Sequence, residues 1–78
     1  MTVKIYTTTT CPYCRMAKDF FKKKGVKYEE LNVETNPKAA AEMVAKSHQM
    51  GVPVIDINGK IITGFDKQAI ENALAVKA

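Results

Sequence analysis

The chain has 78 residues, 46% of them hydrophobic and 26% charged, with a formal net charge of +4. This length allows one domain spanning residues 1–78, and nearly every apolar residue is needed in its core. The first residues alternate apolar and polar without a signal-like apolar segment, and no run approaches the roughly 18 apolar residues of a membrane span. We therefore expect a protein that spans no membrane and resides in the cytoplasm, where structural disulfides are rare.

Positive charge is concentrated in three consecutive lysines at positions 22–24. Cations at the end of a helix favour its dipole, so this run is expected to be a solvated helix end. A nucleic-acid surface would need basic residues interleaved with aromatic ones on one face, and the sequence lacks that pattern. We expect no nucleic-acid partner, although the charge can speed encounters with acidic partners at low salt.

Residues 2–7 predict a first strand because apolar and polar side chains alternate along them. One face of this strand carries Val3 and Ile5, and the other carries Lys4 and Tyr6. Residues 12–24 predict a helix, with Pro12 at its first position and Gly25 as the left-handed residue past its end. Apolar side chains spaced three and four apart predict one stripe on this helix: Tyr13, Met16, Ala17, Phe20 and Phe21.

Residues 26–33 predict a second strand, and its alternation slips at Glu29 and Glu30, which indicates a bulge or a ragged edge. A second helix follows, with Asn36 as its cap and Pro37 in its first turn. Its predicted apolar stripe consists of Ala40, Met43, Val44 and Ser47.

Residues 53–63 predict two short strands joined by Asn58-Gly59, a strong hairpin signal. Asp66 is the expected cap of a last helix whose buried positions are Ile70, Ala73 and Leu74. The order is β-α-β-α-β-β-α. A β-α-β unit pairs its strands in parallel through a right-handed crossover, and a hairpin adds antiparallel strands. We therefore expect an α/β fold with a four-stranded mixed sheet and three helices on its two faces.

The chain has two cysteines, Cys11 and Cys14, at the start of the predicted first helix. Residues i and i+3 of a helix share one face, so the two sulfur atoms can approach within disulfide distance. Cys11 is expected at or beside the cap, where free N–H groups and the positive end of the dipole favour a thiolate. Arg15 and Lys18 add positive charge nearby, and Cys14, inside the first turn, is expected to be less exposed.

These positions predict that the Cys11 thiolate attacks a substrate disulfide and that Cys14 resolves the resulting mixed disulfide. A purely structural disulfide across so small a ring would contribute only about 2 kcal/mol. A structural zinc site needs four ligands, and the chain offers two cysteines and the single His48, so no metal is expected. A C-x-x-C pair near a β-α-β pattern in a cytosolic chain is a known redox signature.

Three segments carry a family resemblance: "CPYC" at 11–14, "GVPV" at 51–54 and "GFD" at 64–66. With these in order along essentially the whole chain, the sequence resembles the glutaredoxin family of the thioredoxin-like superfamily. The resemblance implies a thioredoxin-like fold with a cis peptide bond before Pro53, facing Cys11. The backbone N–H and C=O of Val52 would then be free to pair with a substrate backbone.

The resemblance also implies a set of substrate or glutathione contacts: Pro12, Tyr13, Gln49, Val52, Pro53, Gly64, Phe65 and Asp66. Two charged anchors differ from the family pattern. Thr8 stands where glutathione-dependent members have a lysine or arginine, and Lys67 stands where they often have a second acidic residue. Tyr13 is expected to be partly exposed, whereas Phe65 could either contact a partner or pack beneath the last helix.

The function implied is a dithiol–disulfide oxidoreductase that reduces protein disulfides or glutathione mixed disulfides, as a monomer without a bound cofactor and with glutathione as co-substrate. The "GF" pair also resembles small glutaredoxin-like proteins that receive electrons from the flavoprotein thioredoxin reductase and feed ribonucleotide reductase. Two further hypotheses are an iron–sulfur cluster-binding module, which would use Cys11 and glutathione thiols between two subunits, and a scaffold whose cysteines are idle.

Overall fold

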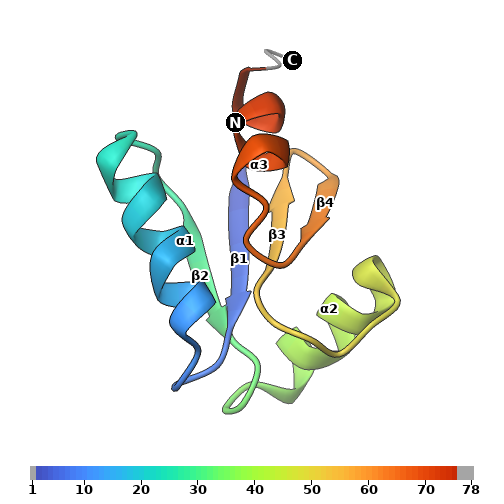
Figure 1. Cartoon of the computed structure of the whole chain (residues 1–78). Helices are drawn as coiled ribbons and strands as arrows, with labels where there is room; N and C mark the ends of the chain where they lie inside the picture. Colours follow the sequence, from blue (N-terminus) through green and yellow to red (C-terminus); the bar gives the residue numbers. More distant parts are fainter. Residues whose placement is uncertain (1, 76–78) are drawn as a thin grey trace.

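The computed structural model describes residues 2–75, and within them the elements follow the predicted order (Figure 1). The strands are β1 (Val3–Thr7), β2 (Glu29–Asn32), β3 (Val54–Ile57) and β4 (Lys60–Thr63). The helices are α1 (Pro12–Lys23), α2 (Pro37–Ser47) and α3 (Lys67–Ala75). In the sheet the strand order is β2-β1-β3-β4, with β1 parallel to β2 and antiparallel to β3, and β3 antiparallel to β4. The mixed four-stranded sheet is confirmed. None of the described helices combines the length and apolar character needed to cross a bilayer.

The core has two parts, one on each face of the sheet. The larger part lies between the sheet and helices α1 and α3, and its buried members include Val3, Ile5, Ala17, Phe21, Ile55 and Ile70. The smaller part lies under α2 and consists of Tyr6, Ala39, Met43 and Val54. Successive side chains of a strand point to opposite faces, so β1 and β3 each contribute to both parts, as predicted for β1.

The start and stop signals of the elements are confirmed. Asn36 caps α2 by accepting a hydrogen bond from the N–H of Ala39 at 3.2 Å, and Asp66 caps α3 by accepting one from Ala69 at 3.1 Å. The left-handed residues of the hairpin turn, Asn58 and Gly59, have φ values of 52° and 91°. Both conformations match the turn chemistry of a two-residue hairpin.

The predicted apolar stripe of α1 was wrong in part. The face that packs on the sheet carries Cys14, Ala17 and Phe21, which are buried. Met16 lies beside that face and is 48% exposed, and Tyr13 is 61% exposed, which confirms the partial exposure expected of Tyr13. The spacing of apolar residues predicts that a helix has an apolar side. The rotation of the helix about its axis determines which of these residues the sheet buries.

Two smaller expectations also need correction. In α2 the buried residues are Ala39 and Met43, while Val44, predicted to be in the stripe, is 37% exposed. The second strand is shorter than predicted, and its pairing with β1 runs without interruption from Lys4↔Glu29 to Thr7↔Asn32. It therefore contains no bulge. Its irregular alternation reflects an edge strand whose glutamates face solvent.

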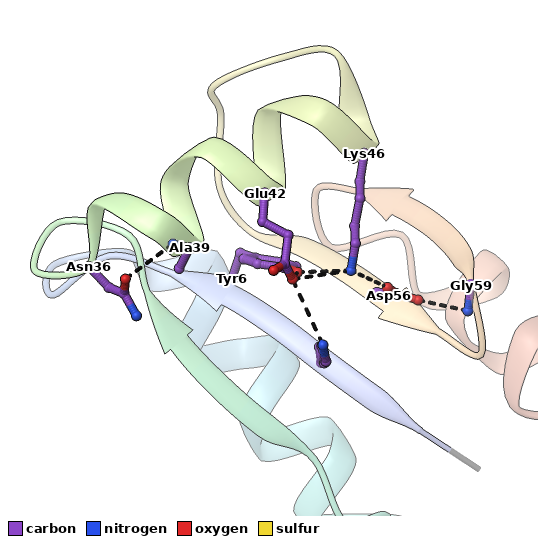
Figure 2. Close-up of polar contacts among 8 residues, drawn as sticks. Tyr6, Asn36, Ala39, Glu42, Lys46, Asp56 and Gly59 are labelled. Carbon is purple, nitrogen blue, oxygen red and sulfur yellow. Dashed lines mark hydrogen bonds and ion pairs between the residues drawn. The ribbon is translucent and has the colours of Figure 1, made fainter.

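A polar network ties α2 to the sheet, and Figure 2 shows its side chains converging between the two layers. The buried Tyr6 donates its hydroxyl hydrogen bond to Glu42. The ammonium group of Lys46 donates to Asp56 at 2.7 Å, to the Tyr6 hydroxyl at 3.0 Å and to Glu42 at 3.3 Å. The second oxygen of Asp56 accepts from the N–H of Gly59 at 2.7 Å, so the same carboxylate also holds the hairpin turn.

The protonation of this network follows from its hydrogen bonds. The hydrogen bonds to Asp56 and Tyr6 raise the pKa of Lys46, and those from Tyr6 and Lys46 lower the pKa of Glu42. Burial raises the pKa of Tyr6. At neutral pH Lys46 is therefore a cation, Glu42 an anion and Tyr6 a neutral phenol, and each buried polar group of the network has a partner.

Replacing Lys46 by methionine is expected to lower the free energy of unfolding by about 1–3 kcal/mol, because Asp56 would lose its ammonium partner while remaining mostly buried. Urea denaturation measures this change, and Lys38→Met, on an exposed position of the same helix, is the matched control. The double variant Lys46→Met/Asp56→Asn should be less destabilised than the sum of the two single variants. Equal stability of Lys46→Met and Lys38→Met would contradict the role given to the network.

Candidate active site

The topology brings three loops to one end of the sheet. Because β3 is antiparallel to both β1 and β4, the end of β1, the start of β3 and the end of β4 adjoin one another. The register places Val54 opposite both Tyr6 and Thr63. The segments next to these positions are 8–11, 49–53 and 64–66. Together with the first turn of α1 they contain every residue that the sequence predicts for the site.

Cys11 is the N-cap of α1, as expected for the attacking cysteine. Its backbone is extended, with φ −116° and ψ 107°, and its sulfur accepts a hydrogen bond from the N–H of Cys14 at 3.1 Å. Pro12 follows at the first helical position, where its missing N–H leaves no hydrogen bond unmade. Cys11 is partly exposed. The helix thus presents an N–H donor and the positive end of its dipole to a sulfur that substrate can reach.

Cys14 lies one helical turn further in and is only 1% exposed. Burial raises the pKa of its thiol to about 12, and the hydrogen bond to Cys11 and the negative charge on Cys11 act in the same direction. A backbone hydrogen bond from Thr8 and the charge of Lys18 act in the opposite direction, and each is smaller than the effect of burial and that of the hydrogen bond to Cys11. No disulfide joins the two cysteines in this structure. The site therefore holds one accessible sulfur and one buried thiol that is hard to ionise.

The loop before β3 has the backbone form that the resemblance implies. The Val52–Pro53 peptide bond is cis, and Pro53 is buried. The carbonyl of Pro53 accepts a hydrogen bond from the N–H of Gly64 at 2.8 Å, which joins this loop to the one after β4. Within residues 2–75, no hydrogen bond involves the backbone N–H or C=O of Val52. These two groups are therefore available to an extended peptide.

The remaining predicted contacts differ in how accessible they are. Tyr13 projects into solvent. The side chain of Gln49 donates to the carbonyl of Gly51 at 3.4 Å, so it lies along its own loop. Phe65 is half-buried, and its ring packs edge-on against that of Phe20 with 6.1 Å between the ring centres. The side chain of Asp66 caps α3.

One charged cluster near the site has no signal in the sequence. The carboxylate of Glu30 on β2 accepts hydrogen bonds from Thr7 at 2.8 Å and from Lys18 at 3.0 Å. Burial acts to raise the pKa of Glu30, but the hydrogen bonds from Lys18 and Thr7 outweigh it and lower that pKa. The cluster fixes the side chain of Lys18, whose charge acts on Cys14. Its three residues lie on β1, α1 and β2, and these elements are brought together only when the chain folds.

Metal-ligand groups are scattered among the described residues, and no three of the histidine, cysteine, aspartate or glutamate side chains there lie close enough to hold an ion together. His48 lies at the end of α2, where it adopts a left-handed conformation with φ 61° and is exposed.

Comparisons with known proteins agree on one family. The glutaredoxin family model matches residues 3–62. An uncharacterized glutaredoxin-like 8.6 kDa protein of the rubredoxin operon in Clostridium pasteurianum is 43% identical over 72 residues, which cover 92% of this chain and 96% of that one. Glutaredoxin 3 of Escherichia coli K12 is 42% identical over 64 residues, which cover 82% of this chain and 77% of that one.

A solved structure is similar over the full length. The glutaredoxin-like protein NrdH-redoxin from Escherichia coli superposes with a TM-score of 0.85 at 27% sequence identity, covering 100% of this chain and 99% of that one. The fold agrees with this structural match. The chain belongs to the glutaredoxin family, whose members are thiol–disulfide oxidoreductases.

Proposed function

We propose that this chain reduces protein disulfides or glutathione mixed disulfides, with Cys11 as the nucleophile and Cys14 as the resolving thiol. The observation that supports this most is the asymmetry of the pair. Cys11 is partly exposed at a helix N-terminus, whereas Cys14 is buried and its pKa is raised to about 12. An exposed thiolate attacks first, and a buried thiol cannot compete for an external disulfide.

The first step exchanges one disulfide for another. The Cys11 thiolate attacks one sulfur of the substrate disulfide, a Cys11–substrate bond forms, and the second substrate sulfur leaves as a thiolate that takes a proton from water. The free N–H and C=O of Val52 support this step by pairing with the substrate backbone beside its cysteine.

The second step closes the cysteine pair. Once Cys11 is bonded to substrate it carries no negative charge, so one cause of the raised pKa of Cys14 disappears. Cys14 then loses its proton and attacks the Cys11 sulfur. The Cys11–Cys14 disulfide forms, the bond between Cys11 and the substrate breaks, and the substrate sulfur that Cys11 first attacked leaves as a thiolate that takes up a proton. The substrate has gained two electrons and two protons, and the enzyme is oxidised.

The oxidised pair must be reduced again by glutathione or by a flavoprotein reductase. Two positions favour the second donor. Thr8 and Lys67 replace a basic and an acidic residue that the family resemblance associates with glutathione binding. The structurally similar NrdH-redoxin of Escherichia coli is described as having a thioredoxin-like activity profile, which supports the same donor. An alternative function is therefore that of a thioredoxin-reductase-dependent electron donor to ribonucleotide reductase.

The reaction is proposed to run in the cytoplasm and in a monomer. The mechanism starts from two reduced thiols, which a reducing compartment maintains. Cys11, Cys14 and Val52 all belong to one chain, so the mechanism requires no second subunit.

Replacing Cys14 by serine should trap the intermediate, because no thiol remains to resolve it. With an intramolecular disulfide in a protein as substrate, Cys14→Ser is expected to accumulate a covalent adduct visible by non-reducing mass spectrometry. Turnover should fall about 100-fold or more. Cys11→Ser should form no adduct. An adduct on Cys14 in the Cys11→Ser variant, at a rate near that of Cys11 in the Cys14→Ser variant, would refute the assigned roles.

Electron supply is tested by two coupled assays of NADPH consumption. One contains glutathione and glutathione reductase, and the other contains thioredoxin reductase. We expect faster turnover with thioredoxin reductase, and we expect Thr8→Lys/Lys67→Asp to increase the rate in the glutathione assay, because it restores both charged anchors. A wild-type protein that turns over with glutathione alone would contradict the preferred donor but not the disulfide chemistry.

A further inference from the structure

A groove of about 740 Å³ lies between α1 and α3, and its lining includes residues that the fold leaves uncovered. Phe20 and Phe65 contribute its aromatic surface, and Met16 lies at the end nearer the cysteines. In Figure 1 the last turns of α1 lie near α3, and the first turn of α1 points to the opposite end of the sheet. The groove therefore begins within a few residues of the active site and extends away from it.

An apolar line along α1 joins the groove to the cysteines. Tyr13, Met16 and Phe20 are spaced three and four residues apart, so they share one side of the helix. The first two are 61% and 48% exposed. Phe65 makes a second connection, because it follows Gly64, whose N–H bonds the carbonyl of Pro53 in the cis-proline loop. Exposed apolar side chains beside a reactive centre are typical of a docking surface.

The rim of the groove is positively charged. The ammonium groups of Lys24 and Lys67 lie 5.6 and 5.8 Å from the centre of the same Phe20 ring. Neither forms an ion pair among residues 2–75. Lys23 lines the same groove, and the carboxylates in the lining are those of Asp19 and Glu71. The three lysines outnumber the carboxylates, so an occupant with negative charge is favoured.

We propose that this groove binds the segment that flanks the reactive disulfide of a protein substrate, and that this segment is acidic and carries an aromatic or large aliphatic anchor. The inference rests on the proposed function, since it assigns the substrate class of the same site. The anchor would lie against Phe20 and Phe65, and its acidic neighbours would pair with Lys24 and Lys67.

The length of the groove along α1 agrees with the length of a short extended peptide segment. Along the axis of α1, Met16 lies about 7.5 Å and Lys23 about 18 Å from Cys11, at 1.5 Å per residue. An extended segment of about six residues covers the longer distance. The recognition element should therefore lie within about six residues of the substrate cysteine.

The test uses synthetic peptides that share one disulfide ring and differ only in a six-residue flank. One flank contains phenylalanine among glutamates, one contains phenylalanine among lysines, and one contains only serine and glycine. Rates of reduction are measured at low and high salt. The acidic flank is expected to raise kcat/KM about 10-fold over the basic flank at low salt, and salt should reduce this advantage.

Variants locate the effect on the groove. Lys23→Glu/Lys24→Glu should lose most of the acidic preference, and Met16→Gln should lose part of it. Both should reduce the serine–glycine peptide at the wild-type rate. The matched control is Lys38→Glu/Lys60→Glu, which changes the net charge equally at exposed positions outside the groove. A loss of preference in that control would assign the effect to net charge and overturn the proposal.

A binding measurement separates this proposal from the proposed function. Disulfide-free versions of the three flanks are titrated into the isotope-labelled protein, and amide chemical shifts are followed by NMR. Shifts of Phe20, Lys24 and Phe65 with the acidic flank only are the expected result. If no peptide is reduced but these shifts occur, the proposed function is wrong and the proposal that the groove binds an acidic segment is supported. If all peptides are reduced at equal rates without such shifts, the groove proposal fails alone.

Discussion

The first turn of α1 is the constraint on which the site depends. At its start the N–H of Cys14 donates a hydrogen bond to the sulfur of Cys11, and the N–H of Arg15 donates one to the carbonyl of Cys11. The same turn leaves Cys11 partly exposed and places Cys14 on the face that packs against the sheet, with Ala17 and Phe21. The difference in exposure between the two cysteines thus follows from one helix boundary.

The sheet supplies the rest of the site through its strand directions. Antiparallel pairing of β3 with both β1 and β4 puts the cysteine loop, the cis-proline loop and the Gly64 loop at one end. The network around Lys46 holds α2 against the sheet face opposite α1, and its Asp56 carboxylate also holds the hairpin turn. The scaffold is therefore fixed by contacts that are remote from the sulfur atoms, and the site residues on the loops are free to meet a substrate.

Local signals in the sequence predicted most of the fold. Four of these signals affect only neighbouring residues: Pro12, Asn36, Asp66 and the Asn58-Gly59 turn. Their structural roles could therefore be inferred from the sequence without knowledge of the fold. The cis-proline loop followed from the family resemblance. What the sequence could not predict depends on packing between distant elements. The rotation of α1, which exposes Met16, and the pairing of Glu30 with Thr7 and Lys18 are of this kind. The exposed apolar residues of α1 are also the ones that gave rise to the docking proposal.

The most direct test of the proposed cysteine roles is the rate of alkylation of each cysteine as a function of pH, resolved by peptide mass spectrometry. We predict that at neutral pH Cys11 reacts and Cys14 does not, because the pKa of Cys14 is raised to about 12. In Cys11→Ala the reaction of Cys14 should begin at lower pH, since the hydrogen bond and charge of Cys11 are gone, yet still above the range of an ordinary thiol because burial remains. Equal reactivity of the two cysteines at neutral pH in the folded wild-type protein would contradict these roles.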